Sequence, residues 1–145
     1  MKVERDIFIR RSPTDIFRYV TGIEHTTEWA AGVAQVQKLH DGPLRVGTPG
    51  RMTVQALGRR VSIGFHITEC APDTALALKT TSGPFPTAGR ATFIGDGAGT
   101  RVTLLISSRI DNPIFRLAQG QFSRATAAYL DNSLRNLKDR LERSP

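Results

Sequence analysis

The stretch LDNSLRNLKDRLE, residues 130–142, decides the fold, because it completes a long helical pattern at the end of the chain. The pattern opens at Asn112, an N-cap candidate, and Pro113, which suits the first helical position. Apolar and small residues then recur at helical spacing on one face, which indicates an amphipathic helix. That face carries Phe122, Thr126, Tyr129, Leu130, Ser133, Leu137 and Leu141. The sequence therefore predicts a long helix over residues 113–142.

This helix would be long enough to cross a whole β-sheet. Unbroken, it would extend roughly 45 Å, at about 1.5 Å per residue. Gly120 is the position where it would bend or be interrupted, and the sequence leaves its continuity there open. The opposite face is charged, and two pairs of opposite charge stand four residues apart, Asp131–Arg135 and Lys138–Glu142.

A period of two replaces the helical spacing in the middle of the chain. Six segments there alternate apolar and polar side chains, and short turns rich in Gly, Pro and Asp separate them. This pattern is typical of strands that pair antiparallel with their neighbours. The six expected strands are 33–39, 50–57, 60–69, 74–80, 89–94 and 100–107, and a seventh, 3–9, opens the chain.

Two short helices are expected between the first strand and the second. Ser12 is an N-cap candidate, Pro13 suits the first helical position, and Asp15 stands three residues after the cap. Gly22 ends this helix, and a second one is expected over 24–29. The expected order is one strand, two short helices, six strands and one long helix, an α+β architecture.

Length and composition bound the class of protein. The 145 residues fit one domain, 1–145, and with 39% hydrophobic and 23% charged residues we expect it to be globular. The apolar runs are too short to span a bilayer, so no membrane span is expected. Cys70 is the single cysteine, which rules out an internal disulfide and favours a cytoplasmic location.

The net charge of +7, from 20 Lys and Arg against 13 Asp and Glu, is scattered along the chain. It forms no basic block and is not interleaved with aromatic residues for base stacking, so no nucleic-acid partner is expected. An interaction module that uses the basic surface remains an alternative, and the sequence leaves a homodimer open.

Motifs for metal, phosphate or nucleophilic chemistry are absent from the sequence. His66 and Glu69 stand three apart on an expected strand, so their side chains face opposite sides and cannot share a metal. We therefore expect no metal and no cofactor. His25 could supply a polar group near Trp29, although a solvated surface position is favoured.

The long helix is the only element able to cover the inner face of the sheet. Thr126 and Ser133 interrupt its large apolar residues and leave volume for an apolar cavity, the usual form of a small-molecule site. The alternative is that larger side chains close over this volume and form an ordinary core. The ligand-binding candidates are Trp29, Phe65, Ile67, Leu78, Leu104, Phe122, Thr126, Tyr129 and Ser133.

The sequence resembles the SRPBCC, or START-like helix-grip, superfamily, and within it the polyketide cyclase/dehydratase group. The matching motifs run in order through nearly the whole chain: RSPTDIF, TTEW, GPLRVGT, GRMTV, ITECAP, GAGTRVT and LDNSLRNLKDRLE. The resemblance implies a seven-stranded antiparallel sheet wrapped around the long helix, with a deep cavity between them and Trp29 at its end. Gly47, Pro72, Gly99 and Thr100 match as turn-forming and structural positions.

Members of this superfamily bind lipids, hormones, quinones or polyketides, and some are cyclases or dehydratases. The resemblance therefore implies binding of a small, largely hydrophobic ligand, or alternatively a polyketide cyclase, aromatase or dehydratase acting in the same cavity. No catalytic motif carries over. For the enzyme we expect Tyr129 as acid and Glu69, in phase with the apolar face of its strand, as base. Arg51 would stabilise an enolate only if it pointed inward, and the alternation around it favours the outside.

Overall fold

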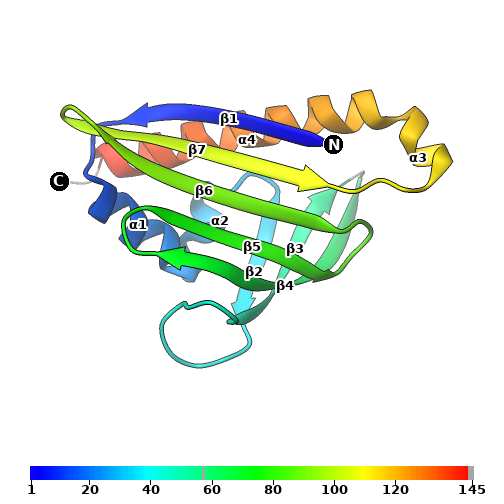
Figure 1. Ribbon diagram of the computed structural model, residues 1–145, viewed down its shortest axis with the longest axis horizontal. Coiled ribbons are helices and arrows are strands. Elements are labelled where there is room, and N and C mark those ends of the chain that lie inside the picture. The colour runs from blue at the N-terminus through cyan, green and yellow to red at the C-terminus, as the bar shows by residue number, and fades with distance from the viewer. Residues whose placement is uncertain (57, 144–145) are drawn as a thin grey trace.

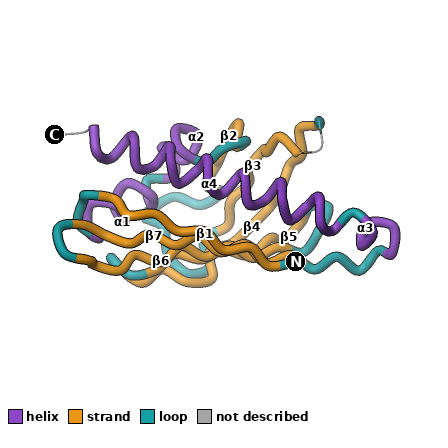
Figure 2. The backbone as a smooth tube through the Cα atoms, turned by 90° about the horizontal axis from the view of Figure 1, so that it is seen from above, coloured by secondary structure: helices purple, strands orange, loops and turns teal. Residues whose placement is uncertain are grey.

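The computed structural model describes residues 1–56 and 58–143. Seven strands form one antiparallel sheet in the order β1-β7-β6-β5-β4-β3-β2, and α4 lies across its inner face (Figures 1 and 2). The strands are β1 (Lys2–Ile9), β2 (Val33–Lys38), β3 (Pro49–Ala56), β4 (Arg59–Ala71), β5 (Ala75–Ser82), β6 (Thr87–Asp96) and β7 (Gly99–Ser108). The helices are α1 (Pro13–Thr21), η1 (Ile23–His25, 3-10), α2 (Thr26–Trp29), α3 (Pro113–Leu117) and α4 (Gln119–Arg143).

This arrangement confirms the predicted seven-stranded antiparallel sheet, the two short helical segments after the first strand and the long C-terminal helix. Residue 57, the last of the expected strand 50–57, lies outside the described residues. The segments α1 and α2 lie near the C-terminal end of α4, whereas α3 lies at the opposite end of the molecule (Figure 1). The two ends of the interface between α4 and the sheet are therefore flanked by different parts of the chain.

The first short helix begins and ends where the sequence predicts. The Ser12 hydroxyl accepts a hydrogen bond from the Asp15 amide at 3.1 Å, and the Gly22 amide donates to the Arg18 carbonyl. The Asp15 carboxylate accepts from Arg11 Nε at 3.2 Å. The Asp15 side chain thus holds Arg11, the residue before the cap.

The long helical pattern is interrupted, but at Ala118 rather than at Gly120. The Ala118 amide reaches back to the carbonyls of Arg116 and Phe115, which closes a tight turn and ends α3. The Phe115 ring then meets Phe122 at a centroid distance of 6.3 Å. Because the two rings face each other across the break, α3 folds against the start of α4 instead of continuing its axis.

The inward face of α4 carries the hydrophobic core of the molecule. It buries Leu130, Ser133, Leu134, Leu137 and Leu141 against β1, β6 and β7. Leu134 is 2% exposed and was not among the residues predicted for this face. It lies between the predicted positions, because a helix pressed onto a curved sheet buries a wider stripe than a single row of side chains.

Charged residues on the outer face of α4 pair partly as predicted. Lys138 Nζ and Glu142 Oε2 stand 2.7 Å apart, four residues along the helix. Asp131 does not pair with Arg135 but with Arg5 of β1, at 3.4 Å. The helix and the first strand are therefore joined by an ion pair as well as by apolar packing.

Gly99 stands where β7 begins and the chain leaves β1. A Cβ at Gly99 would overlap the Ile9 carbonyl oxygen and come within 2.7 Å of Phe8 Cζ. The next residue, Thr100, is fully buried and donates from its hydroxyl to the Arg11 carbonyl at 2.7 Å. This corner needs a residue without a side chain, because backbone atoms occupy the space.

Replacing Gly99 by alanine is expected to lower the free energy of unfolding by about 1–3 kcal/mol, since the added methyl group meets backbone that cannot move without disturbing the β1–β7 ladder. Gly120→Ala is the matched control. A Cβ at Gly120 meets nothing within 4 Å, and alanine is the better helix former by about 1 kcal/mol, so this variant should be more stable. Urea unfolding midpoints measure both, and equal shifts would contradict the close contact at Gly99.

Candidate functional site

Trp29 ends α2 at the joint between the short helices, the sheet and α4. Its carbonyl accepts a hydrogen bond from Asn136 Nδ2 at 3.2 Å, and the Ala31 amide donates to Ser133 Oγ at 2.9 Å. Two side chains of α4 thus hold the backbone on either side of the joint. The indole packs on the core, but its buried Nε1 has no hydrogen-bond acceptor among the described residues.

Tyr129 of α4 lies on the same joint, one helical turn before Ser133. A Cβ at Gly32 would stand 2.9 Å from Tyr129 Cε2, and the positive φ of Gly32 (75°) also favours glycine, so the ring lies directly on backbone. Burial raises the pKa of Tyr129 to about 12. The phenol is therefore neutral at pH 7 and able to donate a hydrogen bond.

The inner face of the sheet follows from strand register. Four residues stand opposite one another across neighbouring strands: Ile106 of β7, Gly89 of β6, Leu78 of β5 and Ile67 of β4. Side chains at these positions therefore point to the same face of the sheet. A Cβ at Gly89 would lie 3.5 Å from Ile106 Cδ1 and 4.0 Å from Leu78 Cδ1. Ile67 is buried, whereas Leu78 and Ile106 are half-buried. The inner face is apolar across these strands and is only partly closed.

Phe65 lies farther along the inner face of β4, opposite Gly50 of β3. Its ring occupies the space above Gly50, where an added Cβ would stand 2.7 Å from Phe65 Cε2. The ring is 3% exposed. Glycine on the neighbouring strand therefore leaves room for the Phe65 ring on the inner face of the sheet.

The predicted ligand-binding residues do not gather at one point. Trp29, Tyr129 and Ser133 lie at the joint, while Phe122 lies toward α3, where its ring centroid is 5.9 Å from that of Phe85. Thr126 lies between them and contacts Met1 Sδ at 3.9 Å. Phe65, Ile67 and Leu104 are buried on the sheet. The set therefore spreads along the interface between helix and sheet.

Ser133 was predicted, as a small residue, to leave volume between the helix and the sheet. It is 1% exposed, and its hydroxyl is taken by the Ala31 amide. Small size at this position instead allows α4 to approach the backbone of the joint.

The helix covers the inner face unevenly. The backbone of α4 approaches β1 most closely and then α2 and β7, whereas β3, β4 and β5 are not among the strands that it approaches closely. A cleft of about 710 Å³ opens at the α3 end, between α3 and the ends of β6 and β7. A second cleft of about 240 Å³ lies between α1 and the end of α4. Neither of these two clefts is the predicted cavity between α4 and the sheet.

Glu69 lies on the outer face of the sheet, so its predicted position at the rim of a pocket is wrong. The register of β4 shifts between Ile67 and Glu69, and this irregularity reverses the alternation that the sequence pattern assumes. The Glu69 carboxylate accepts hydrogen bonds from Arg90 Nε at 2.8 Å and Nη2 at 3.3 Å. The bond from Arg90 lowers the pKa of Glu69, which makes this carboxylate a poor base.

Arg51 points away from the helix. It is exposed and pairs in register with Gly64, on the side of β3 opposite to Gly50 and Phe65. The alternation around Arg51 favoured this orientation. Arg51 therefore does not reach the interface at which Tyr129 lies.

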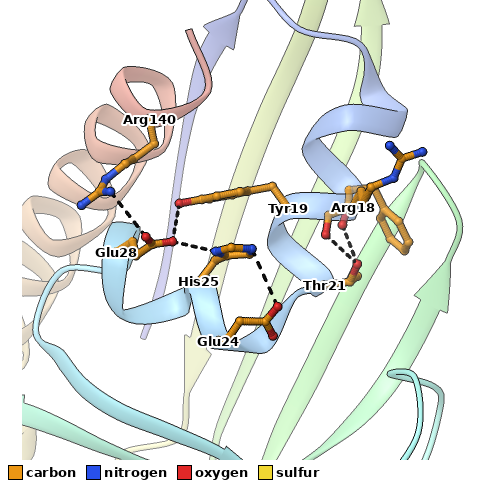
Figure 3. A network of polar contacts seen from close by, with 8 residues as sticks. Arg18, Tyr19, Thr21, Glu24, His25, Glu28 and Arg140 are labelled. Atoms are coloured by element: carbon orange, nitrogen blue, oxygen red, sulfur yellow. Dashed lines mark hydrogen bonds and ion pairs between the residues drawn. The ribbon is translucent and has the colours of Figure 1, made fainter. Parts of the chain in front are cut away.

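A polar cluster surrounds Glu28 beside the joint (Figure 3). Glu28 Oε1 is 2.7 Å from His25 Nδ1 and accepts from the Tyr19 hydroxyl at 3.1 Å. Glu28 Oε2 is 3.4 Å from Arg140 Nη1 of α4. The rings of Tyr19 and His25 stack with a centroid distance of 4.5 Å. The cluster thus connects α1, η1, α2 and α4.

The electrostatics of this cluster favour a charged Glu28 and a neutral Tyr19. Hydrogen bonds from His25 and Tyr19 lower the pKa of Glu28. Burial, together with the bond to Glu28, raises the pKa of Tyr19 to about 12. Because Glu28 is held by three partners, the cluster is better suited to holding the joint together than to moving protons.

This cluster was not predicted from the sequence, which favoured a solvated His25. His25 and Glu28 are three residues apart, which suits a contact within one helical turn, and this signal was available. Tyr19 and Arg140 come from elements distant in the sequence, so no local pattern could bring them to Glu28.

The comparisons identify the family. Residues 1–142 match the protein family described as polyketide cyclase/dehydrase and lipid transport. The chain belongs to this family. Among curated protein sequences, none matches.

Solved structures share the fold at low sequence identity. TTHA0849 from Thermus thermophilus superposes with a TM-score of 0.86 at 21% identity, covering 100% of both chains. The Zhui aromatase/cyclase from Streptomyces sp. R1128 gives 0.83 at 13% identity, over 99% of this chain and 94% of that one. A START superfamily protein from Mycobacterium smegmatis gives 0.73 at 15% identity, over 97% and 98%. The family member described here therefore has a START-like fold.

The raised pKa of Tyr129 predicts a loss of stability at alkaline pH. An unfolded tyrosine loses its proton near pH 10, whereas folded Tyr129 keeps it up to about pH 12. The free energy of unfolding should therefore fall as pH rises from 10 to 12, and the fall should be shallower in Tyr129→Phe.

Tyrosinate absorbance provides an independent check, because the chain has two tyrosines and the pKa of each is raised to about 12. The folded protein should show little tyrosinate at a pH where the denatured protein has already ionised. Ionisation of one tyrosine near pH 10 that disappears in Tyr129→Phe would contradict the buried position of this phenol.

Proposed function

We propose that this protein binds a small, largely hydrophobic ligand between α4 and the inner face of the sheet, beside Trp29 and Tyr129. One observation carries the proposal: the buried Trp29 Nε1 has no acceptor among the described residues, in an otherwise apolar interface. Buried polar groups are nearly always hydrogen-bonded, so an unpaired donor calls for a partner that the described residues do not provide. A bound molecule with an acceptor would supply it.

The apolar lining supports a hydrophobic ligand. Leu76, Leu78 and Ile106 face inward and are only half-buried. An apolar ligand in contact with them would remove more of their surface from water. An apolar lining with one or two polar contacts to the ligand is the common pattern of small-molecule sites.

The polar groups at the joint favour a ligand whose polar end lies beside them. An indole N–H only donates, and the neutral Tyr129 phenol can donate as well. A carbonyl, ether or hydroxyl oxygen would satisfy them. We therefore favour an apolar molecule that carries at least one hydrogen-bond acceptor, a class that includes fatty acids, quinones, sterols and polyketides.

A second candidate function is cyclisation or dehydration of a keto substrate in the same place. It is favoured by the buried neutral phenol of Tyr129, which can donate a hydrogen bond to a carbonyl oxygen as enolate charge develops. Neither carboxylate considered for the base is well placed, because Glu69 lies on the outer face and Glu28 is held by Tyr19, His25 and Arg140. Binding is therefore the function that we place first.

A thermal-shift screen over fatty acids, quinones, sterols and aromatic polyketides tests the binding proposal. A ligand present at about 100 times its Kd should add about 2.7 kcal/mol of stability and raise the melting temperature. Because Trp29 is the only tryptophan, the same ligand should change its fluorescence. A screen without stabilisation, together with unchanged fluorescence, would contradict the proposal.

Variants at the joint test the polar contact. Trp29→Phe and Tyr129→Phe each remove one donor while keeping an aromatic ring, so each should weaken binding of an oxygen-bearing hit by roughly 3- to 10-fold, the value of one hydrogen bond. A hydrocarbon analogue without an acceptor should bind both variants about as well as the unaltered protein. Leu39→Ser, an exposed position away from the interface, serves as a control that leaves binding unchanged.

Turnover separates the two candidate functions. A poly-β-keto substrate should react no faster, and to no different products, with the protein than in buffer alone if the protein only binds. Product formation that is lost in Tyr129→Phe while binding is retained would instead establish the enzyme.

A further inference from the structure

The short helix α3 is unusual in exposing large apolar side chains. Ile114 is 74% exposed and Leu117 is 91% exposed. They stand three residues apart, so they share one face of α3. Few other large apolar side chains of the described residues are strongly exposed, and those that are, such as Leu39, Val46 and Ile94, lie on other elements. The apolar tip, defined as Ile114 and Leu117, is therefore a concentrated feature.

Aromatic packing holds this tip out from the body of the protein. On another side of α3, the Phe115 ring meets Phe85 at a centroid distance of 5.3 Å and nearly at right angles. Phe85 in turn meets Phe122 of α4. The Asn112 side chain caps α3 by accepting from the Ile114 amide at 2.9 Å. The helix is thus fixed in place with its apolar tip outward.

The surface behind the tip is positively charged. Lys79, Arg109 and Arg116 line the 710 Å³ cleft between α3 and the sheet, where Asp111 is the single carboxylate. Asp111 pairs with Arg109 at 3.2 Å, and both side chains are strongly exposed. Residues 112–130 contain no Asp or Glu. These three cations, called the basic rim below, therefore leave an excess of positive charge around the tip.

Position in the fold makes this surface accessible. In both views α3 projects at the end of the molecule opposite the C-terminus, beyond the ends of the strands (Figures 1 and 2). A flat surface could approach the tip without meeting α1, η1 or α2, which lie at the other end.

We propose that the α3 tip and the basic rim form a docking surface for an anionic lipid bilayer, with Ile114 and Leu117 entering the interface and the basic rim contacting lipid phosphates. Interfacial helices combine exposed apolar residues with Lys and Arg in this way, and anionic lipid attracts each such cation. The contact is peripheral, made by one short helix and the side chains behind it. None of the described helices is long and apolar enough to cross a bilayer.

A bilayer fits this surface better than a second copy of the chain. Five helical residues extend only about 7.5 Å, and a stable protein interface needs about 800 Å² from each partner. A copy would also bring the same positive charge against the basic rim. A lipid surface needs no large complementary patch and supplies negative charge. The proposal does not depend on what occupies the interface between α4 and the sheet.

Co-sedimentation with lipid vesicles tests the proposal. The protein should bind vesicles of mixed phosphatidylcholine and phosphatidylglycerol, bind phosphatidylcholine alone weakly, and lose binding as salt is raised. Ile114→Ser/Leu117→Ser should lower the partition coefficient at least tenfold, because two large apolar side chains no longer leave water. Lys79→Gln/Arg109→Gln should lower binding to anionic vesicles by roughly fivefold for each charge and leave binding to phosphatidylcholine unchanged.

A matched control separates the tip from general stickiness. Leu39→Ser/Val46→Ser removes two exposed apolar residues from another part of the surface and should stay within about twofold of the unaltered protein. Circular dichroism melting checks that each variant is folded, and Leu117→Ser alone replaces the double change should that one unfold.

Several results would overturn the proposal. These are no binding to either vesicle, tip variants that bind like the unaltered protein, or a control variant that loses as much binding. Sedimentation velocity without lipid provides another: a dimer that dissociates in the tip variant would show that a second copy occupies this surface instead.

Discussion

Burial of the leucine face of α4 on β1 and β7 is the interaction on which the rest of the structure depends. Leu134 and Leu137 are almost fully buried there, beside Ile9 and Val102. Hydrogen bonds add to this packing at the end of β1, where Lys138 Nζ donates to the Phe8 carbonyl and Glu142 accepts from the Arg10 amide. Because α4 is fastened to one edge of the sheet, the inner faces of β3, β4 and β5 are left to the side chains above them, and to any bound molecule.

The joint around Trp29 and the tip at α3 close the two ends of this arrangement by different means. At the joint, hydrogen bonds to Ser133 and Asn136 and the cluster around Glu28 hold three short elements to α4. At the other end, the rings of Phe85, Phe115 and Phe122 pack together and hold α3 against the start of α4. One end is thus held by polar contacts, and the other is apolar and outward-facing, which suits two surfaces with different partners.

Most of the fold could be predicted from the sequence, because periodicity reports which side chains face a core. The seven strands, the cap at Ser12 and the inward positions of Leu130, Leu137 and Leu141 all follow from it. Glu69 could not be placed, since one irregular residue in β4 reverses every later side chain and leaves no mark in the pattern. The break at Ala118 depends on rings that meet only in three dimensions.

The candidate site was less predictable than the fold. The sequence pattern indicated Trp29 and Tyr129, which both lie at the joint, and it indicated free volume at Ser133, whose hydroxyl accepts a hydrogen bond from the Ala31 amide. Spacing identifies which residues face inward. The hydrogen-bond partner of each polar atom, however, often comes from an element that is distant in the sequence. Glu28 illustrates this, because Arg140 lies 112 residues away.

The pairing of β1 with β7 also has a consequence for biosynthesis. Ile9 at the end of β1 is in register with Thr100 at the start of β7, so the first strand is synthesised about ninety residues before its partner begins. At roughly 5–20 residues per second that delay lasts on the order of 5–20 s. During that time β1 has no neighbour in the sheet and exposes Ile7 and Ile9. The edge of the sheet formed by β1 is therefore the last to find its partner, because β7 must be synthesised first.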